Sequence, residues 1–124
     1  MRTLVPTEAQ EQTSLFHWAK LQTRKYPELA LMYHIPNGGS RNTVEAHNLK
    51  MQGVKPGVPD IFLPVARGGF HGLFIEMKRR KGGEVSQEQK GWLEALQGQG
   101  YRAEVCKGWE EAKNLIEKYL KGEK

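Results

Sequence analysis

The sequence predicts an α/β domain in which helices flank a mixed central sheet, and two observations lead to this prediction. Segments with helical and strand-like periodicity alternate along the chain, in the order helix, strand, helix, strand, strand, helix, strand, helix. Two of the strand segments, residues 57–63 and 72–78, are short and apolar and are separated by a turn at Arg67-Gly68-Gly69, so we expect them to pair. The length of 124 residues predicts one domain over residues 1–124.

Local signals define the elements of the first half. Thr7 follows Pro6 and is a suitable N-cap for a helix over residues 7–25, which Pro27 ends. Residues 29–35 are apolar enough for a strand. Residues 43–52 have the pattern of a short helix, with Val44, His47 and Met51 on one side and Gly53 as its stop.

The second half is defined in the same way. Ser86 and Gln89 form a capping-box pattern that starts a helix, and glycines at 98 and 100 end it. Residues 101–107 alternate enough for a last strand. An amphipathic helix follows, and residues 121–124 are expected to be a frayed tail. Its apolar positions are Trp109, Ala112, Leu115, Ile116 and Tyr119.

The composition narrows the class of protein. The chain has 19 lysine and arginine residues against 14 aspartate and glutamate residues, a formal charge of +5, which favours a polyanionic partner. The single cysteine, Cys106, excludes an intramolecular disulfide and a cysteine-rich zinc site. No apolar run has the length of a signal peptide or a membrane span, so we expect an intracellular protein that does not engage a membrane.

The central strand pair carries carboxylates that a plain core would not contain. Asp60 opens the first strand, while Glu76 and Lys78 share one face of the second because side chains alternate along a strand. If the strands pair, Asp60 lies beside Glu76. Two neighbouring carboxylates repel each other and favour protonation when buried, a conflict that bound Mg²⁺ or Mn²⁺ relieves. An ordinary hairpin with exposed charges is the alternative interpretation.

Two further polar residues are predicted to face inward from helices. A step of about 100° per residue puts Glu8 on the apolar face of the first helix and Glu11 at its edge. Glu8 either stabilises the helix terminus through the dipole or reaches the carboxylate site. Gln89 faces inward at the start of its helix, where closing the capping box would by itself explain it.

Two segments are candidates for phosphate contact. Residues 36–42 have the composition of a loop, which is either a simple turn or brings Asn37 and Arg41 close to a phosphate. Arg79, Arg80 and Lys81 directly follow the carboxylate strand. This basic run is either a solvated end or a second phosphate contact.

Taken together, these motifs resemble a known family. Gly57-Val58-Pro59-Asp60, followed after fifteen residues by Glu76-Met77-Lys78, is similar to the core of the PD-(D/E)XK nucleases. Pro36-Asn37-Gly38-Gly39, Phe74 to Arg79, and Ser86 to Trp92 followed by Gly100-Tyr101 extend the similarity to the VRR-NUC branch, the virus-type replication-repair nucleases. The similarity spans roughly residues 8 to 107.

The resemblance implies a restriction-endonuclease-like fold and a set of site residues. Asp60, Glu76 and the main-chain carbonyl of Met77 would bind Mg²⁺ or Mn²⁺, and Lys78 would lie beside the attacking water. Glu8 matches the acidic residue of the family's first helix, with Glu11 close enough to compete for that role. Gln89 matches the glutamine that follows the lysine strand.

The function expected from this resemblance is metal-dependent hydrolysis of DNA phosphodiesters. Stand-alone members resemble bacterial or viral proteins and are expected to dimerise, which favours branched DNA such as a Holliday junction as the substrate. The alternative is a DNA-binding or scaffold module that keeps the fold without catalysis. The presence of Asp60, Glu76 and Lys78 together speaks against it. No G-x-S-x-G elbow, Walker loop or dinucleotide fingerprint supports another class of enzyme.

Overall fold

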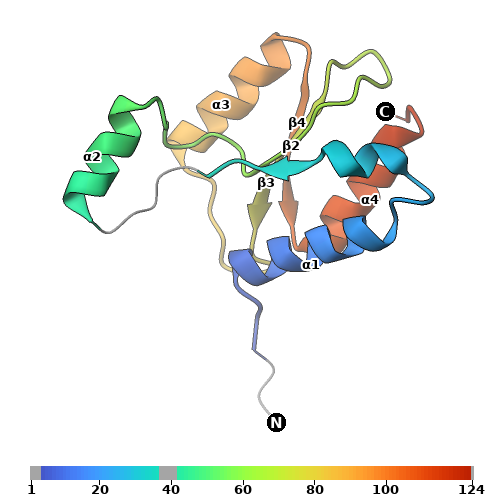
Figure 1. The fold of residues 1–124 in the computed structure, drawn as a ribbon, viewed down its shortest axis with the longest axis horizontal. Helices are drawn as coiled ribbons and strands as arrows, with labels where there is room; N and C mark the ends of the chain where they lie inside the picture. The colour runs from blue at the N-terminus through green and yellow to red at the C-terminus, as the bar shows by residue number, and fades with distance from the viewer. Residues whose placement is uncertain (1–3, 37–41, 124) are drawn as a thin grey trace.

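A four-stranded sheet forms the centre of the protein (Figure 1). The computed structural model describes residues 4–36 and 42–123. The strands lie in the order β1 (Tyr33–His34), β2 (Ile61–Leu63), β3 (Leu73–Lys78) and β4 (Arg102–Lys107). The first two pairings are antiparallel and the β3–β4 pairing is parallel, so the predicted mixed sheet is confirmed.

Helices cover the two faces of this sheet. Figure 1 shows α1 (Glu8–Leu21) and α4 (Trp109–Leu120) side by side below the sheet, with α3 (Gln87–Gly98) above it. The parallel β3–β4 pairing requires a crossover, which α3 supplies. Within the described ranges, no helix combines the length and apolar character that a membrane span needs.

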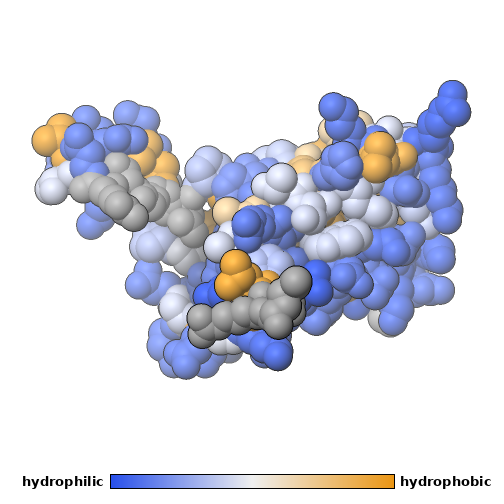
Figure 2. Space-filling view, turned by 90° about the horizontal axis from the view of Figure 1, so that it is seen from below, coloured by the Kyte–Doolittle hydropathy of each residue, from blue (hydrophilic) through white to orange (hydrophobic). Residues whose placement is uncertain are grey.

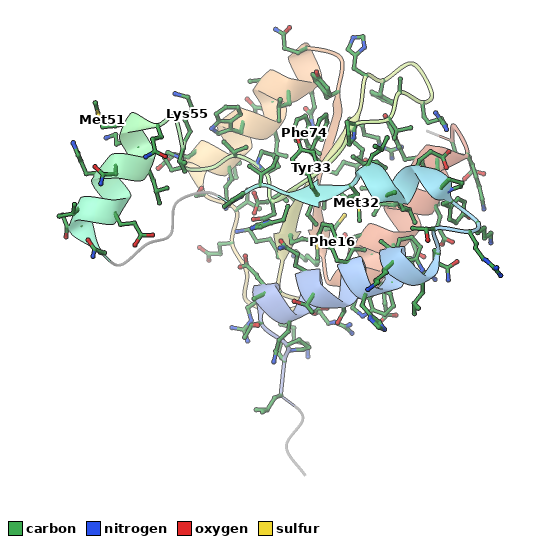
Figure 3. The ribbon with its side chains drawn as sticks, in the orientation of Figure 1. Phe16, Met32, Tyr33, Met51, Lys55 and Phe74 are labelled. Carbon is green, nitrogen blue, oxygen red and sulfur yellow. The ribbon has the colours of Figure 1, made fainter. Side chains whose placement is uncertain are left out.

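The core lies between the sheet and the α1–α4 layer because the side chains of β3 alternate. Leu73, Ile75 and Met77 are buried in this core. Phe16 packs against it from α1, and Met32 enters it from the segment before β1 (Figure 3). Burial of this apolar face fixes the register of β3. It therefore also fixes which residues face α3.

The opposite face of the sheet is aromatic at one end and charged at the other. Phe62 of β2 stacks on Phe74 of β3, with ring centroids 4.1 Å apart, and Tyr101 meets Phe74 edge-on at 5.2 Å. Glu76 and Lys78 follow Phe74 at intervals of two residues on the same strand. The fold thus turns the charged end of β3 toward the first turn of α3.

Three predicted elements differ from the structure. The strand predicted over residues 57–63 is shorter, because β2 covers only Ile61–Leu63; Gly57 has a positive φ and Pro59 has no N–H for a ladder. The strand predicted over residues 29–35 was wrong for most of its length, because Pro27–Leu31 form a 3₁₀ helix and β1 has only two residues. Pro27 pre-sets a helical φ at the first position of that turn. The first helix ends at Leu21 rather than at residue 25.

Helix α2 (Thr43–Met51) stands away from the rest of the molecule (Figure 1). None of its residues is buried, and Val44 and Met51 are 69% and 74% exposed. Figure 2 shows apolar atoms gathered over α2 at one end of a mostly hydrophilic face. The Asn42 side chain caps the helix by accepting from the Val44 and Glu45 N–H groups. The side of this helix predicted to carry Val44, His47 and Met51 is therefore not buried in the core.

The approach to Asp60 is held by a close contact with α3. Gly57 has a φ of +88°, and a Cβ atom at this position would lie 2.8 Å from the main-chain carbon of Glu88. Glycine is the residue that tolerates both conditions. The contact fixes the segment that ends at Asp60 against the first turn of α3.

Candidate active site

The β2–β3 pairing brings Asp60 to Glu76. Ile61 pairs with Ile75 in the antiparallel register, so the same register, continued by one residue, places Asp60 opposite Glu76. The Asp60 side chain then continues the ladder, because its Oδ2 accepts a 2.8 Å hydrogen bond from the Met77 N–H. A side-chain oxygen thus takes the place of a main-chain carbonyl at the end of β2. This bond orients the Asp60 carboxylate along β3.

The main chain of Asp60 is fixed from its other side. Its carbonyl oxygen accepts from the Ile35 N–H at 2.7 Å and contacts His34 Nδ1 at 2.8 Å. A carbonyl only accepts, so this contact requires the tautomer with hydrogen on Nδ1. Sequence reasoning missed His34; only its place just before the 36–42 loop connected it with the site. Asp60 is therefore held by β1 through its main chain and by β3 through its side chain.

Glu76 has a buried carboxyl group with one unsatisfied oxygen. The residue is 1% exposed, and its Oε1 has no hydrogen-bond partner among the described residues. Burial first, and then the neighbouring Asp60 carboxylate, raise the pKa of Glu76 to about 9, with a smaller contribution from Glu8. Only Lys78 acts to lower this pKa. An orphaned oxygen beside a second carboxylate is the arrangement that a bound cation would complete.

Lys78 completes the charged end of β3. Lys78 is 5% exposed, and its Nζ lies 4.0 Å from Glu76 Oε2. A buried ammonium needs a carboxylate nearby to offset its desolvation. The two carboxylates and the ammonium that the sequence placed on one face are thus close together in the structure.

Gln89 serves two purposes through the two ends of its amide. Its Oε1 accepts from the Ser86 N–H at 2.9 Å, which closes the capping box. Its Nε2 donates to Glu76 Oε2 at 3.3 Å. The two interpretations left open for Gln89 are therefore compatible, and the start of α3 is tied to the carboxylate centre.

The residues present fit a hard divalent cation. Among the residues described, no three His, Cys, Asp or Glu side chains cluster as a metal site. A cation held by Asp60 and Glu76 would thus take its further ligands from the main chain, water or substrate, a set of oxygens that suits Mg²⁺ or Mn²⁺. The orphaned Glu76 Oε1 is the observation in favour of this fit.

The orientation predicted for the first helix was wrong for its two acids. Glu11, placed at the edge by the angular step, is 1% exposed, while Glu8 is exposed. Glu11 accepts from Arg80 Nε at 2.7 Å and from the Trp109 N–H at 3.2 Å. The reason is tertiary, because α4 and the end of β3 supply donors at the edge of α1. Glu11 therefore joins three elements, and Glu8 remains within electrostatic range of Glu76.

The residues predicted to contact phosphate differ in how available they are for such a contact. Arg79 and Lys81 are exposed beside the site. Arg80 instead forms ion pairs with Glu11 and Glu110. The other two candidates, Asn37 and Arg41, lie outside the described residues.

Removal of the carboxylate should cost more stability at Glu11 than at Glu8. We expect Glu11→Ala to lower the free energy of unfolding by about 1–3 kcal/mol, because it leaves the Trp109 N–H without its acceptor. Glu8→Ala should lower it by less than about 1 kcal/mol, the scale of a helix-terminus charge effect. Urea unfolding of both variants measures this difference. Equal stability of the two variants would contradict the assignment of Glu11 as the structural acid.

The raised pKa of Glu76 predicts how the metal-free protein responds to pH. Between the ordinary value of 4.5 and about 9, the folded state binds a proton that the unfolded chain has released. The Glu76 contribution to stability is therefore fully present below about pH 4.5 and is lost as the pH rises toward 9. Urea unfolding in EDTA across this range should show a decline that Glu76→Gln reduces. An identical decline in the glutamine variant would locate the effect elsewhere.

Comparison with known proteins gives matches of two kinds, to a family model and to solved structures. The model of the VRR-NUC domain matches residues 4–110. A solved structure described as "VRR_NUC domain protein" is similar with a TM-score of 0.82 and 34% sequence identity, over 96% of this chain and 92% of that chain. A search of curated proteins found no significant match.

Proposed function

The chain belongs to the VRR-NUC domain family, as its motifs predicted, and from this premise we propose that it is a Mg²⁺- or Mn²⁺-dependent endonuclease that hydrolyses DNA phosphodiesters. The family assignment supports a nuclease-type fold with DNA as substrate. The observation that carries the proposal is the buried Glu76 beside the half-buried Asp60, with the orphaned Glu76 Oε1 and with Lys78 nearby. A structural acid such as Glu11 has partners for its buried oxygens, whereas Glu76 Oε1 has none among the described residues, which destabilises a structure that binds no cation.

The roles proposed for the residues follow from their positions. Asp60, Glu76 and the Met77 carbonyl would hold the cation, which when bound polarises the scissile phosphate and lowers the pKa of water. The Lys78 ammonium would orient the attacking water and offset the charge that develops on the phosphate. Gln89 would hold the Glu76 carboxylate in place through its 3.3 Å bond. Glu8 would act from the rim through its charge, and exposed Arg79 and Lys81 would bind flanking phosphates.

A cleavage assay tests this proposal. Purified protein should cut DNA with Mn²⁺, lose all cleavage in EDTA, and retain almost none as Asp60→Asn. Labelled junction, flap, single-stranded and duplex DNA in one panel would reveal the preferred structure, for which we propose branched DNA. A protein that takes up no Mn²⁺ in calorimetry and cuts none of these substrates, yet binds them, would instead be the non-catalytic DNA-binding module.

We also propose that the protein acts as a homodimer, with α2 in the contact. In support, α2 exposes Val44 and Met51, and none of its residues is buried. A helix of nine residues is marginal without a packing partner. Multi-angle light scattering should give twice the chain mass, and the double variant Val44→Lys with Met51→Lys should give the monomer mass. A variant that remains dimeric would show that the interface lies outside α2. A monomeric wild type would refute the proposed dimer.

A further inference from the structure

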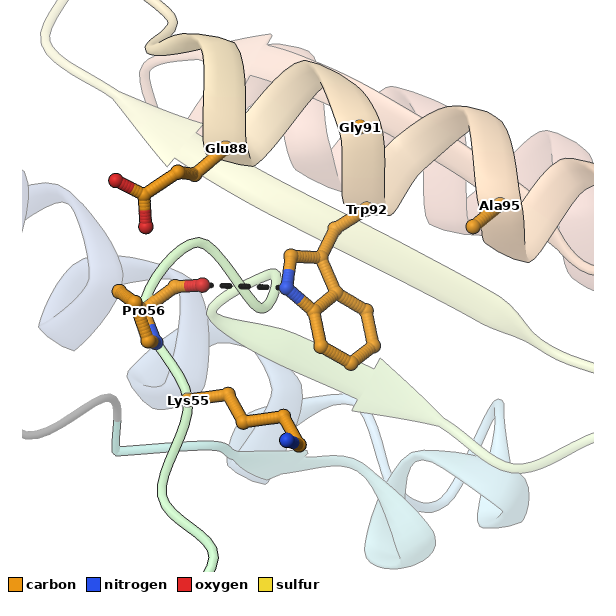
Figure 4. Close-up of a pocket in the computed structure, with 6 residues that line it drawn as sticks. All are labelled: Lys55, Pro56, Glu88, Gly91, Trp92 and Ala95. Carbon is orange, nitrogen blue, oxygen red and sulfur yellow. Dashed lines mark hydrogen bonds between the residues drawn. The ribbon is translucent and has the colours of Figure 1, made fainter. Parts of the chain in front are cut away.

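Beside the catalytic residues lies an open recess that the proposed mechanism does not use. Its volume is about 500 Å³, and it lies between α3 and the segment that leads to Asp60 (Figure 4). Six residues line it: Lys55, Pro56, Glu88, Gly91, Trp92 and Ala95. Its surface is mostly apolar because the indole of Trp92 and the small residues of α3 form it.

The recess is built to leave one aromatic ring accessible. Gly91 and Ala95 lie one helical turn apart on α3, and a Cβ atom at Gly91 would meet nothing within 4 Å. The small residues keep the space beside the Trp92 ring open. The half-buried indole is held in place because its Nε1 donates to the Pro56 carbonyl oxygen at 3.1 Å. Trp92 therefore presents a fixed flat surface to solvent.

Charge is distributed unequally around this ring. Figure 4 shows the Lys55 ammonium and the Glu88 carboxylate on opposite sides of the bond that joins Pro56 to Trp92. A phosphate is attracted to the Lys55 side and repelled from the Glu88 side. A ligand with a flat apolar part and an attached anion would thus place its flat part on the indole and its anion toward Lys55.

The recess also lies near the carboxylate centre, because both are reached from the first turns of α3. Gln89, which donates to Glu76, lies three residues before Trp92 on α3, or about 4.5 Å along the helix axis. The Gly57–Glu88 contact holds the other wall of the recess against α3. One rigid unit thus carries both the catalytic centre and the recess.

We propose that this recess binds an unpaired nucleobase next to the scissile phosphate, with the base stacked on Trp92 and its phosphate beside Lys55. A base in a duplex is stacked on both faces and does not reach the ring, so the recess selects DNA with a single-stranded or splayed nucleotide. This inference rests on the proposed nuclease function and adds to it a residue that determines specificity.

Removing one base from the DNA tests the inference without altering the protein. Labelled duplexes with a single-stranded arm are made with an abasic nucleotide at each arm position in turn, and binding is followed by fluorescence anisotropy in EDTA. For the wild type, the abasic change at one position near the branch should weaken binding by about tenfold. A uniform response at every position would overturn the inference.

Two substitutions at Trp92 separate stacking from the hydrogen bond to Pro56. Trp92→Phe and Trp92→Leu both lose the Nε1 donor, but only phenylalanine keeps a ring. We expect the leucine variant to bind the intact arm about tenfold more weakly, with no further loss at the sensitive abasic position, and the phenylalanine variant to stay within about threefold of the wild type. Fully paired DNA should bind both variants alike. Similar behaviour of leucine and phenylalanine on the armed DNA would overturn the inference.

Control variants distinguish the recess from general effects. Trp109→Leu changes another half-buried tryptophan, on α4, and should leave the preference for the armed DNA intact. Lys55→Gln should reduce the salt dependence of binding by about one phosphate contact, and Lys118→Gln, on the exposed side of α4, should not. Circular dichroism confirms folding of each variant. If the wild type cuts DNA but shows no sensitive abasic position, the stacking inference alone fails. If it neither binds nor cuts DNA, the proposed function fails and the inference with it.

Discussion

Glu76→Gln is expected to reduce DNA cleavage by at least roughly a thousandfold while making the metal-free protein more stable. Cleavage falls because an amide cannot supply the negative charge that holds a divalent cation. Stability rises because burial and Asp60 raise the pKa of Glu76 to about 9, so near neutral pH folding requires this carboxyl group to take up a proton. Glutamine removes that requirement and keeps the shape of the protonated side chain. The gain near neutral pH is on the order of 1–3 kcal/mol, the scale of the proton uptake that is no longer required.

The opposite signs of these two effects make the experiment informative. Cleavage is measured with Mn²⁺, and stability by urea unfolding in EDTA. Glu94→Gln, an exposed glutamate on α3, is the matched control and should change neither quantity. Loss of both activity and stability in Glu76→Gln would indicate that Glu76 is a structural residue. Retained cleavage would exclude it from the catalytic centre.

Lys78→Met is expected to lower kcat by roughly 10²- to 10⁴-fold, the range for loss of a group that acts on the proton or charge of the reaction. Methionine keeps most of the buried apolar stem and removes only the ammonium. Because Lys78 is the group that lowers the pKa of Glu76, the variant should also shift the pH at which Mn²⁺ uptake begins to a higher value. Single-turnover cleavage and Mn²⁺ calorimetry at several pH values measure the two effects.

Lys81→Gln is the control for Lys78 because Lys81 is exposed beside the same site. Loss of one exposed phosphate contact should raise KM and lower the salt dependence of binding, with kcat nearly unchanged. Lys78→Met should show the reverse division between kcat and KM. If both lysine variants changed only KM, Lys78 would be a DNA-binding residue rather than a residue at the reacting atoms.

Much of the fold could be predicted because its signals are local. Capping residues, glycine stops and alternating apolar positions defined α3, β3, β4 and α4 to within about two residues. The failures occurred where tertiary contacts override such signals. The apolar segment before β1 became a 3₁₀ turn that places Leu29 and Met32 in the core. The polar side chain of Glu11 is buried because distant residues supply its donors.

The sequence by itself determined that Asp60, Glu76 and Lys78 belong together, since strand alternation and the turn between β2 and β3 fix their face and their neighbours. The tertiary structure alone decided which acid of α1 is buried, that Arg80 pairs with Glu11 and Glu110, and that Trp92 stands beside an open recess next to Gln89. The physical reason is the separation along the chain over which each kind of interaction acts. Alternation and capping depend on residues a few positions apart, whereas the environment of a charge or a ring depends on every element packed around it.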